Sequence, residues 1–579
     1  MIKKNPYDQF RSEVIKLMSD IIRVPAKKIE GVLERPPEST GADLALPCFF
    51  YAAKKGKNPV EVANNIVKRI RGSHLISSAQ AMGPYINFHA DWNLMNKRVM
   101  DQILGEKHNY GRVIQKKPNK VMIEYSSPNT NKPLHLGHLR NDALGMALSN
   151  IIEFSGHNVI KSILYSNRGM GVSKCIIAYD KWGRGGKPGK KKPDHFVGDF
   201  YVMFEKKKNK KLEEELKTVL KKWESGDKKI RSIWEKIDKW VMEGFKQTYK
   251  DFGSEFDVEF KESDFYSKAG NIIKQGLKKK VFFKDYDGAI VADLEKHKLT
   301  KKVILRPDGT SVYVTNDLAL TQYKFEKFGI NKSIWVVGSE QDLYFQQLFK
   351  IFELLGTKNV SQNCLHYSYG LVYLPEGKMK SREGTVVDAD DIIKEMTDLA
   401  RKEIKKRDKK ISKKNLEKRA KAIGLGALKY FLLKMEAKKN IHFKPKESIS
   451  FEGDTGPYIQ YSHARACSIL EKANSKGGKF DAKLLTHEKE KALIKKLMEF
   501  PETVRNAAKY LKPNFIANYA HELANTFNNF YEEVPVLKGD NVHKGHEPIR
   551  AARVALVRAT TITLKNALAL LGIDAPVKM

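Results

Sequence analysis

Short apolar runs and helical periodicity alternate through the middle of the chain. From about residue 119, runs rich in Val, Ile and Tyr precede segments whose apolar residues recur at helical spacing, and Gly156 stands where a helix should end. The predicted strands are 120–126, 159–165, 311–314, 334–337 and 371–374, and the predicted helices are 135–154 and 316–327. Because strands alternate with helices, we predict an α/β fold built on a parallel sheet.

The pattern changes on both sides of this region. Near the N-terminus, Asn58 and Pro59 predict a helix start, and 85–88 is predicted to be a strand. A Gly- and Lys-rich stretch at 183–190 interrupts the α/β pattern, and helical periodicity dominates the C-terminal part of the chain. We therefore predict an N-terminal α/β domain at 1–113, a parallel-sheet domain at 114–390 with an insertion at about 183–300, a helical connector at 391–452, and an all-helical domain at 453–579.

Composition adds a strong positive charge to this picture. The 579 residues include 105 Lys and Arg against 68 Asp and Glu, a net charge of +37. Such a surface suits a polyanion, with nucleic acid as the first candidate, although a general enrichment in lysine would give the same count. Four scattered cysteines indicate neither a disulfide framework nor a zinc ribbon. No apolar run is long enough to span a membrane, and no signal-type segment is present, so a cytoplasmic location is expected.

Two short segments point to nucleotide chemistry. The first signature, residues 132–138, ends in His-Leu-Gly-His at a predicted helix start, where free backbone N–H groups and the helix dipole favour phosphate. Gly137 has no Cβ, so a nucleoside could lie flat against the backbone. The second signature, residues 378–382, reads Lys-Met-Lys-Ser-Arg between glycines at 377 and 384. A basic loop of this kind can close over a triphosphate.

Together the two signatures resemble the H-I-G-H and K-M-S-K-S motifs of class I aminoacyl-tRNA synthetases. Longer stretches narrow the resemblance to the arginyl-tRNA synthetase family; they are residues 124–141, 451–465 and 570–579. The resemblance implies a Rossmann-like catalytic domain, an N-terminal add-on domain that touches tRNA, and a C-terminal helical domain that binds the anticodon. It also implies ATP, L-arginine and tRNA(Arg) as substrates, formation of arginyl-adenylate and pyrophosphate, and a monomeric state.

A guanidinium is planar and always charged, and carboxylates hold it best. Glu124 and Asp317 follow predicted strands, at the sheet edge where such folds bind ligands. For either acid alone a surface or capping role is the alternative, and Asp317 suits a helix N-cap. The resemblance implies that arginine is bound by Glu124, Ser127, Asn129, Tyr313, Asp317 and Gln341. It implies that ATP is bound by His135, Gly137, His138, Lys378, Met379, Lys380 and Ser381, and that Lys132, His135, His138 and Lys378 are catalytic.

The second signature departs from the family motif, because Ser381 stands where a second lysine is expected. Lys132 resembles the lysine that replaces it in some family members, while Lys380 and Arg382 are competitors for the same role. Mg²⁺ is expected to arrive with ATP, and no dedicated protein metal site is predicted. Two alternative functions are another class I enzyme, such as a cysteinyl-tRNA synthetase or a small nucleotidylyltransferase, and a non-catalytic RNA-binding paralogue.

Overall fold

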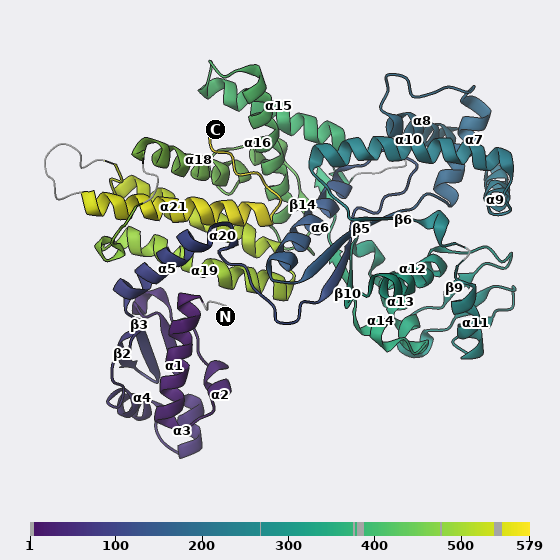
Figure 1. Ribbon diagram of the computed structural model, residues 1–579. Helices are drawn as coiled ribbons and strands as arrows, with labels where there is room; N and C mark the ends of the chain where they lie inside the picture. The colour runs from purple at the N-terminus through teal and green to yellow at the C-terminus, as the bar shows by residue number, and fades with distance from the viewer. Residues whose placement is uncertain (1–4, 267, 375–376, 379–386, 475–477, 538–546) are drawn as a thin grey trace.

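A parallel β-sheet lies at the centre of the computed structural model, between a large helical region and an insertion of helices and short strands (Figure 1). The N-terminal part of the chain forms a separate lobe beneath the helical region. The structure describes residues 5–266, 268–374, 377–378, 387–474, 478–537 and 547–579.

Among the described residues, the central sheet has five strands in the order β11-β10-β4-β5-β6, and every neighbouring pair is parallel. The strands are β4 (Lys120–Glu124), β5 (Asn158–Tyr165), β6 (Val258–Lys261), β10 (Lys332–Gly338) and β11 (Cys364–Tyr369). The helices next to it are α6 (Leu136–Phe154), α12 (Tyr313–Phe328) and α13 (Asp342–Leu354). Since β5 and β10 lie on opposite sides of β4, the strand order reverses at β4, which is where open α/β sheets bind ligands.

The predictions for β4, α6, β5 and β10 are confirmed within a few residues, but the strand at 311–314 is wrong. Helix α12 begins at Tyr313, and the Thr315 hydroxyl accepts a hydrogen bond from the Val312 backbone N–H at 3.1 Å. The β-branched and aromatic residues favoured a strand locally, whereas this cap favours a helix. Residues 258–261, inside the predicted insertion, form the edge strand β6 of the central sheet.

The strand predicted at 371–374 is confirmed as β12 (Val372–Leu374), but it lies outside the central sheet. It pairs with β13 (Gly377–Lys378) and with β14 (Ile441–His442), and we call these three strands the small sheet. The edge strand β11 of the central sheet was not predicted, although its apolar and polar residues alternate as in a half-buried strand.

The insertion between β5 and α12 combines long helices with a second three-stranded sheet. Its helices are α7 (Met170–Trp182), α8 (Pro193–Lys207), α9 (Lys210–Glu224), α10 (Lys228–Phe252) and α11 (Gly270–Lys278). The strands are β7 (Phe282–Lys284), β8 (Ile290–Ala292) and β9 (Lys302–Leu305), all antiparallel. Helix α10 crosses the top of the sheet domain in Figure 1.

The N-terminal lobe contains an antiparallel sheet in the order β1-β3-β2. Its elements are α1 (Pro6–Ile22), α2 (Ala26–Glu30), β1 (Leu44–Pro47), α3 (Phe49–Lys55), α4 (Pro59–Val67), β2 (Ile76–Met82), β3 (Tyr85–Ala90) and α5 (Trp92–Glu106). The predicted helix start is confirmed, since Asn58 caps α4. Arg35 forms ion pairs with Glu499 at 3.0 Å and Glu502 at 2.6 Å, so the lobe is held against the C-terminal helices.

The C-terminal part is helical, as predicted. Its helices are α15 (Ala389–Arg407), α16 (Lys413–Leu433), α17 (Pro445–Ser448), α18 (Gly456–Ala473), α19 (Glu488–Tyr510), α20 (Pro513–Glu533) and α21 (Glu547–Leu570). The chain end folds back on this region, because Gln460 donates to the carbonyl of Asp574 at 2.8 Å and Lys429 to that of Gly572 at 2.8 Å. In the part of the chain that the structure describes, no helix has the length and apolar character needed to cross a membrane.

Close packing of α6 on the sheet gives a test of the fold. A Cβ at Gly145 would overlap the buried Tyr125 side chain, so Gly145→Ala should lower the free energy of unfolding by about 1–3 kcal/mol. Gly105→Ala is the control, because that exposed position of α5 has no heavy atom within 4 Å. Denaturant unfolding followed by circular dichroism measures both. Equal stability of Gly145→Ala and the starting protein would contradict this packing.

Candidate active site

The chain turns sharply where β4 ends. Ser126 and Ser127 have φ values of 65° and 43°, in the left-handed region that non-glycine residues rarely adopt. The Asn141 side chain accepts a hydrogen bond from the Ser126 backbone at 2.6 Å, and the Ser127 hydroxyl accepts one from the Leu164 backbone at 3.2 Å. This strained turn, held from α6 and β5, directs the following residues across the edge of the sheet.

A cavity of about 830 Å³ lies at this edge, and we call it the strand-end cavity. It is lined by Ser127, Asn129, Ser166, Lys301, Lys302, Val303, Val312, Tyr313, Val314, Asp317, Val337, Gln341 and Tyr344. Five of the six residues predicted to bind arginine are in this list, from three separate chain segments. Glu124 is the exception.

Asp317 is the acid of the strand-end cavity. It is the fifth residue of α12, so the alternative that it caps the helix is wrong. The Tyr344 hydroxyl donates a hydrogen bond to its carboxylate. Burial raises the pKa of Asp317 to about 6, and the Glu124 charge acts in the same direction, while Tyr344, Lys324 and Lys302 oppose the rise. Its carboxylate is therefore close to its titration range at neutral pH.

Glu124 lies at the end of β4 and is 5% exposed, and its carboxylate is already paired with a side-chain cation, Lys324. The ammonium of Lys324 from α12 forms a buried ion pair and hydrogen bond with the Glu124 carboxylate. Sequence reasoning missed Lys324. Spacing could have predicted it: Lys324 comes seven residues after Asp317, so both side chains lie on one face of the predicted helix.

The two histidines of the first signature face each other at the start of α6. Their ring centroids are 3.9 Å apart, and the Nδ1 atom of each accepts a backbone N–H at 3.1 Å, from Gly137 for His135 and from His135 for His138. Burial, together with nearby Lys132, lowers the pKa of His135 to about 3, and burial also lowers the pKa of His138. Both rings are therefore neutral, with the proton on Nε2, and each offers an N–H donor.

The backbone joins the first signature to the segment that follows the second. The Leu136 N–H donates to the Val387 carbonyl at 3.1 Å, and the Ala389 N–H donates to the Leu134 carbonyl at 3.0 Å. Lys378 belongs to β13 and pairs through its backbone with Tyr373. Met379, Lys380 and Ser381, which were predicted to bind ATP, lie outside the described residues.

Arg140, one turn beyond the histidines, ties α6 to the small sheet. Its buried guanidinium donates to four backbone carbonyls, those of Gly370 (2.5 Å), Leu371 (3.1 Å), Ala437 (3.0 Å) and Lys439 (2.8 Å). These residues lead into β12 and β14, and β12 is bonded to the strand that begins the second signature. Sequence patterns did not predict this arrangement, because a lone Arg on a helix is usually solvated.

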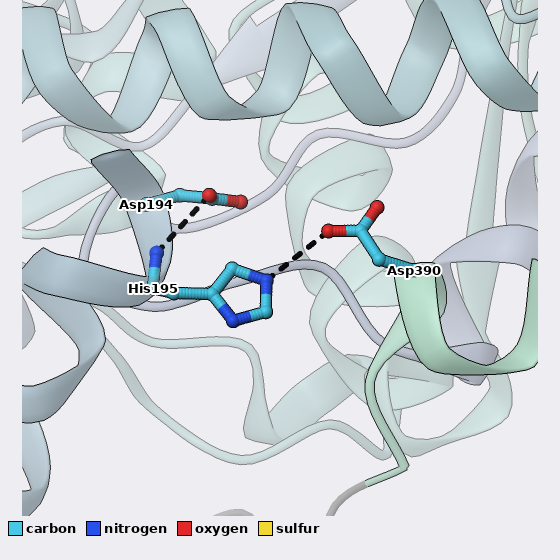
Figure 2. Close-up of side chains that lie close together, drawn as sticks. All are labelled: Asp194, His195 and Asp390. Carbon is cyan, nitrogen blue, oxygen red and sulfur yellow. Dashed lines mark hydrogen bonds and ion pairs between the residues drawn. The ribbon is translucent and has the colours of Figure 1, made fainter. Parts of the chain in front are cut away.

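A cluster of Asp194, His195 and Asp390 lies where the insertion meets the start of α15 (Figure 2). His195 Nε2 is 3.1 Å from the Asp390 carboxylate and 3.4 Å from that of Asp388. The potential ligand atoms of Asp194, His195 and Asp390 lie within 4.8 Å of one another, as in a metal site. However, the Lys192 ammonium contacts Asp194 at 3.1 Å and Asp390 at 2.6 Å, so a protein cation already neutralises the carboxylates. The cluster is best described as an ion-pair junction.

Comparison with known proteins defines the class and then the family. A family model described as the catalytic domain of class I tRNA synthetases (R) matches residues 99–444, so the parallel sheet and its two signatures are those of a class I aminoacyl-tRNA synthetase. Models of the arginyl-tRNA synthetase N-terminal domain and of the DALR anticodon-binding domain match residues 8–90 and 459–579. The chain belongs to the arginyl-tRNA synthetase family.

Individual relatives agree with this assignment. The arginine–tRNA ligase of Treponema denticola is 42% identical over 93% of this chain and 92% of its own length, and that of Parabacteroides distasonis is 38% identical over 94% and 95%. The solved structure of Thermus thermophilus arginyl-tRNA synthetase superposes with a TM-score of 0.82 at 27% identity, covering 98% of this chain and all of the other. These matches support neither of the alternative functions.

The ion-pair junction predicts a pH-dependent contribution to stability. The hydrogen bond to Asp390 raises the pKa of His195, so its contribution is fully present below the unfolded pKa of about 6.5 and is lost as pH rises through the folded value. His195→Gln should therefore destabilise the protein most at about pH 5.5 and least at about pH 8.5. Chemical unfolding across this range measures the difference, with exposed His108→Gln as the control. A difference that does not change with pH would argue against the charged contact.

Proposed function

We propose that this chain is an arginine–tRNA ligase that activates L-arginine with ATP and transfers it to the terminal adenosine of tRNA(Arg). The observation that carries the proposal is the acid-containing strand-end cavity beside the start of α6, in a member of the arginyl-tRNA synthetase family. The first step forms arginyl-adenylate and pyrophosphate, and the second releases AMP.

The arginine side chain enters the strand-end cavity. The Asp317 carboxylate, oriented by Tyr344, pairs with the guanidinium, and Glu124 contributes a second carboxylate from beneath the cavity. Tyr313, 57% exposed in the first turn of α12, packs beside the guanidinium. At the other end, the polar side chains of Ser127, Asn129 and Gln341 hold the amino and carboxylate groups.

ATP is held at the start of α6 by His135, Gly137 and His138, and by Lys378, Met379, Lys380 and Ser381 of the second signature. The two neutral imidazoles donate Nε2–H bonds to phosphate oxygens. Gly137 has a local role as well, since a Cβ there would lie 2.9 Å from the His135 ring and disturb its cap. Mg²⁺ arrives with ATP and offsets phosphate charge, without a protein ligand set of its own.

Catalysis is the in-line attack of the arginine carboxylate on the α-phosphorus, with pyrophosphate as the leaving group. No covalent enzyme intermediate is needed, so the protein acts by orienting the two substrates and by stabilising the charge that builds on the phosphoryl oxygens. His135, His138, Lys132 and Lys378 supply that stabilisation. Lys132 is near enough to both histidines to lower their pKa values, so its charge acts on the same space.

The remaining domains bind tRNA. The proposed division is an N-terminal tRNA-binding domain at 1–113, a catalytic domain at 114–390, a connector at 391–452 and an anticodon-binding domain at 453–579. The net charge of +37 supports a polyanionic partner. The family resemblance adds that tRNA is needed for the first step, and we propose a monomer that acts in the cytoplasm.

Substitution of Asp317 tests the amino-acid specificity. The starting protein should charge a total tRNA pool with arginine and with no other amino acid. Asp317→Asn should weaken arginine binding by on the order of 3–5 kcal/mol, because a buried guanidinium would lose its charged partner. Calorimetry of arginine and ATP separately should show that ATP affinity persists. Glu326→Gln, exposed on the same helix, is the control. Unchanged arginine affinity in Asp317→Asn would refute this pocket.

Substitution of Lys132 tests which lysine replaces the missing one. If Lys132 stabilises the transition state, Lys132→Ala should cut turnover by about a hundredfold, equivalent to roughly 3 kcal/mol. The KM values for arginine and ATP should change less, since ground-state phosphate contacts remain. Lys380→Ala should be milder. The opposite ranking, with Lys380→Ala crippling and Lys132→Ala benign, would assign the role to the second signature itself.

A further inference from the structure

Lys324 is a buried cation on α12, the helix that carries Tyr313 and Asp317 of the strand-end cavity. Its side chain is 1% exposed and that of its partner Glu124 is 6% exposed. The ammonium also lies 5.2 Å from the Phe260 ring centre and 5.3 Å from that of Trp335. An ammonium is strongly hydrated in water, so this position is tolerable only because the carboxylate and the two ring faces replace that water.

Lys324 lies on the same face of α12 as two residues that line the cavity. Tyr313, Asp317 and Lys324 are four and then seven residues apart, so they follow one face of the helix. Seven residues correspond to about two turns, or roughly 10 Å along the axis. Tyr313 therefore lies at the exposed end of this face, Asp317 in the cavity, and Lys324 below it against the end of β4.

The charges of the site need such a cation. Glu124 and Asp317 are two buried acids close enough for the Glu124 charge to raise the pKa of Asp317, and like charges at close range oppose simultaneous ionisation. The Lys324 ammonium offsets the charge of Glu124, which leaves the charge of Asp317 available to the guanidinium. Without it, the same pair of acids would carry an unmatched negative charge in a desolvated site.

We propose that Lys324 is a positioning residue of the arginine site: its ammonium holds the Glu124 carboxylate in place and neutralises it, so that Asp317 stays ionised to receive the guanidinium. This inference rests on the proposed function, because it takes the strand-end cavity as the arginine site. Lys324 itself does not line the cavity.

The groups around Asp317 fix the direction of the effect. It is faced by the Tyr344 hydroxyl of α13, Lys302 of β9, Glu124 of β4 and Lys324 of its own helix, and its charge also acts on Glu262, which follows β6. Glu124 raises the pKa of Asp317, and Lys324 lowers it. Removal of the lysine charge therefore raises the pKa of Asp317 further, and the carboxylate needed for arginine is lost at a higher pH.

Lys324→Met tests the proposal in the full-length protein. Calorimetric titration with L-arginine between about pH 5.5 and about pH 9 should show that the acid-side loss of affinity moves up by about one pH unit. Because Asp317 starts from a pKa of about 6, binding should be roughly twofold weaker at pH 7 and close to tenfold weaker at about pH 5.5. The defect should shrink toward the alkaline end. In aminoacylation assays with tRNA, the KM for arginine should rise while the KM for ATP stays within about twofold.

Three further variants separate this role from a general packing effect. Lys324→Arg keeps the charge and should bind arginine with the starting pH profile. In the double variant Lys324→Met with Glu124→Gln, the charge that needs neutralising is gone, so the pH profile should return even if affinity does not. Lys174→Met is the matched control, because Lys174 is bonded to Glu205 and lies 5.4 Å from the Tyr201 ring in the insertion. It should lower stability without changing the arginine profile.

The outcomes are decisive in either direction. An unchanged pH profile in Lys324→Met, or a shifted profile that persists in the double variant, would overturn the proposal. If Lys324→Met fails to fold, Lys324→Gln is used in its place, since an amide still donates to Glu124 but carries no charge, and the same shift is expected. Failure of the proposed function is recognised separately, by retention of arginine affinity in Asp317→Asn.

Discussion

The active-site framework depends on one buried cation, the guanidinium of Arg140, and on the four backbone carbonyls that surround it. A buried charge is costly unless hydrogen bonds replace its water, and here the acceptors are all main-chain oxygens. They belong to the two segments that enter β12 and β14. Because β12 is also bonded to β13, helix α6 and the base of the second signature share one rigid frame. The first signature and Lys378, more than 200 residues apart in the sequence, are thereby joined through one hydrogen-bonded framework.

Burial at this sheet edge acts in opposite directions on acids and bases, and both effects suit the chemistry. Desolvation raises the pKa of Asp317 and lowers the pKa values of His135 and His138. The histidines are thus neutral hydrogen-bond donors, and the positive charge near the phosphates has to come from lysines. The acid would be protonated too readily if its neighbour Glu124 were unpaired, which is why the Lys324 pair matters to a site two helical turns away. Burial at the same sheet edge therefore sets the protonation of Asp317 and of both histidines.

The sequence predicted those parts of the fold whose signals are local. β4, α6, β5 and β10 follow strong periodic patterns, and Asn58 marks its helix start by side-chain chemistry alone. The failures have two causes. Residues 311–314 have strand-like side chains, but a local cap starts a helix there, and 371–374 is a strand whose partners form a different sheet. The site follows the same division. Five of the cavity residues were predicted from the family resemblance, whereas Lys324, Tyr344 and Arg140 act through partners that only the folded chain brings together.

The insertion is part of the active-site framework, and its glycines show why. In α8, a Cβ at Gly198 would lie 2.7 Å from the Pro133 ring in the first signature, and in α10 a Cβ at Gly244 would overlap the Asp194 side chain. These two contacts bring the helices close enough for Lys192 and His195 to reach Asp390, which lies in the first turn of α15. The junction therefore links the insertion to the start of α15. Since Asp388, the N-cap residue of α15, pairs with His135 through the backbone, a shift of the insertion would be transmitted directly to His135.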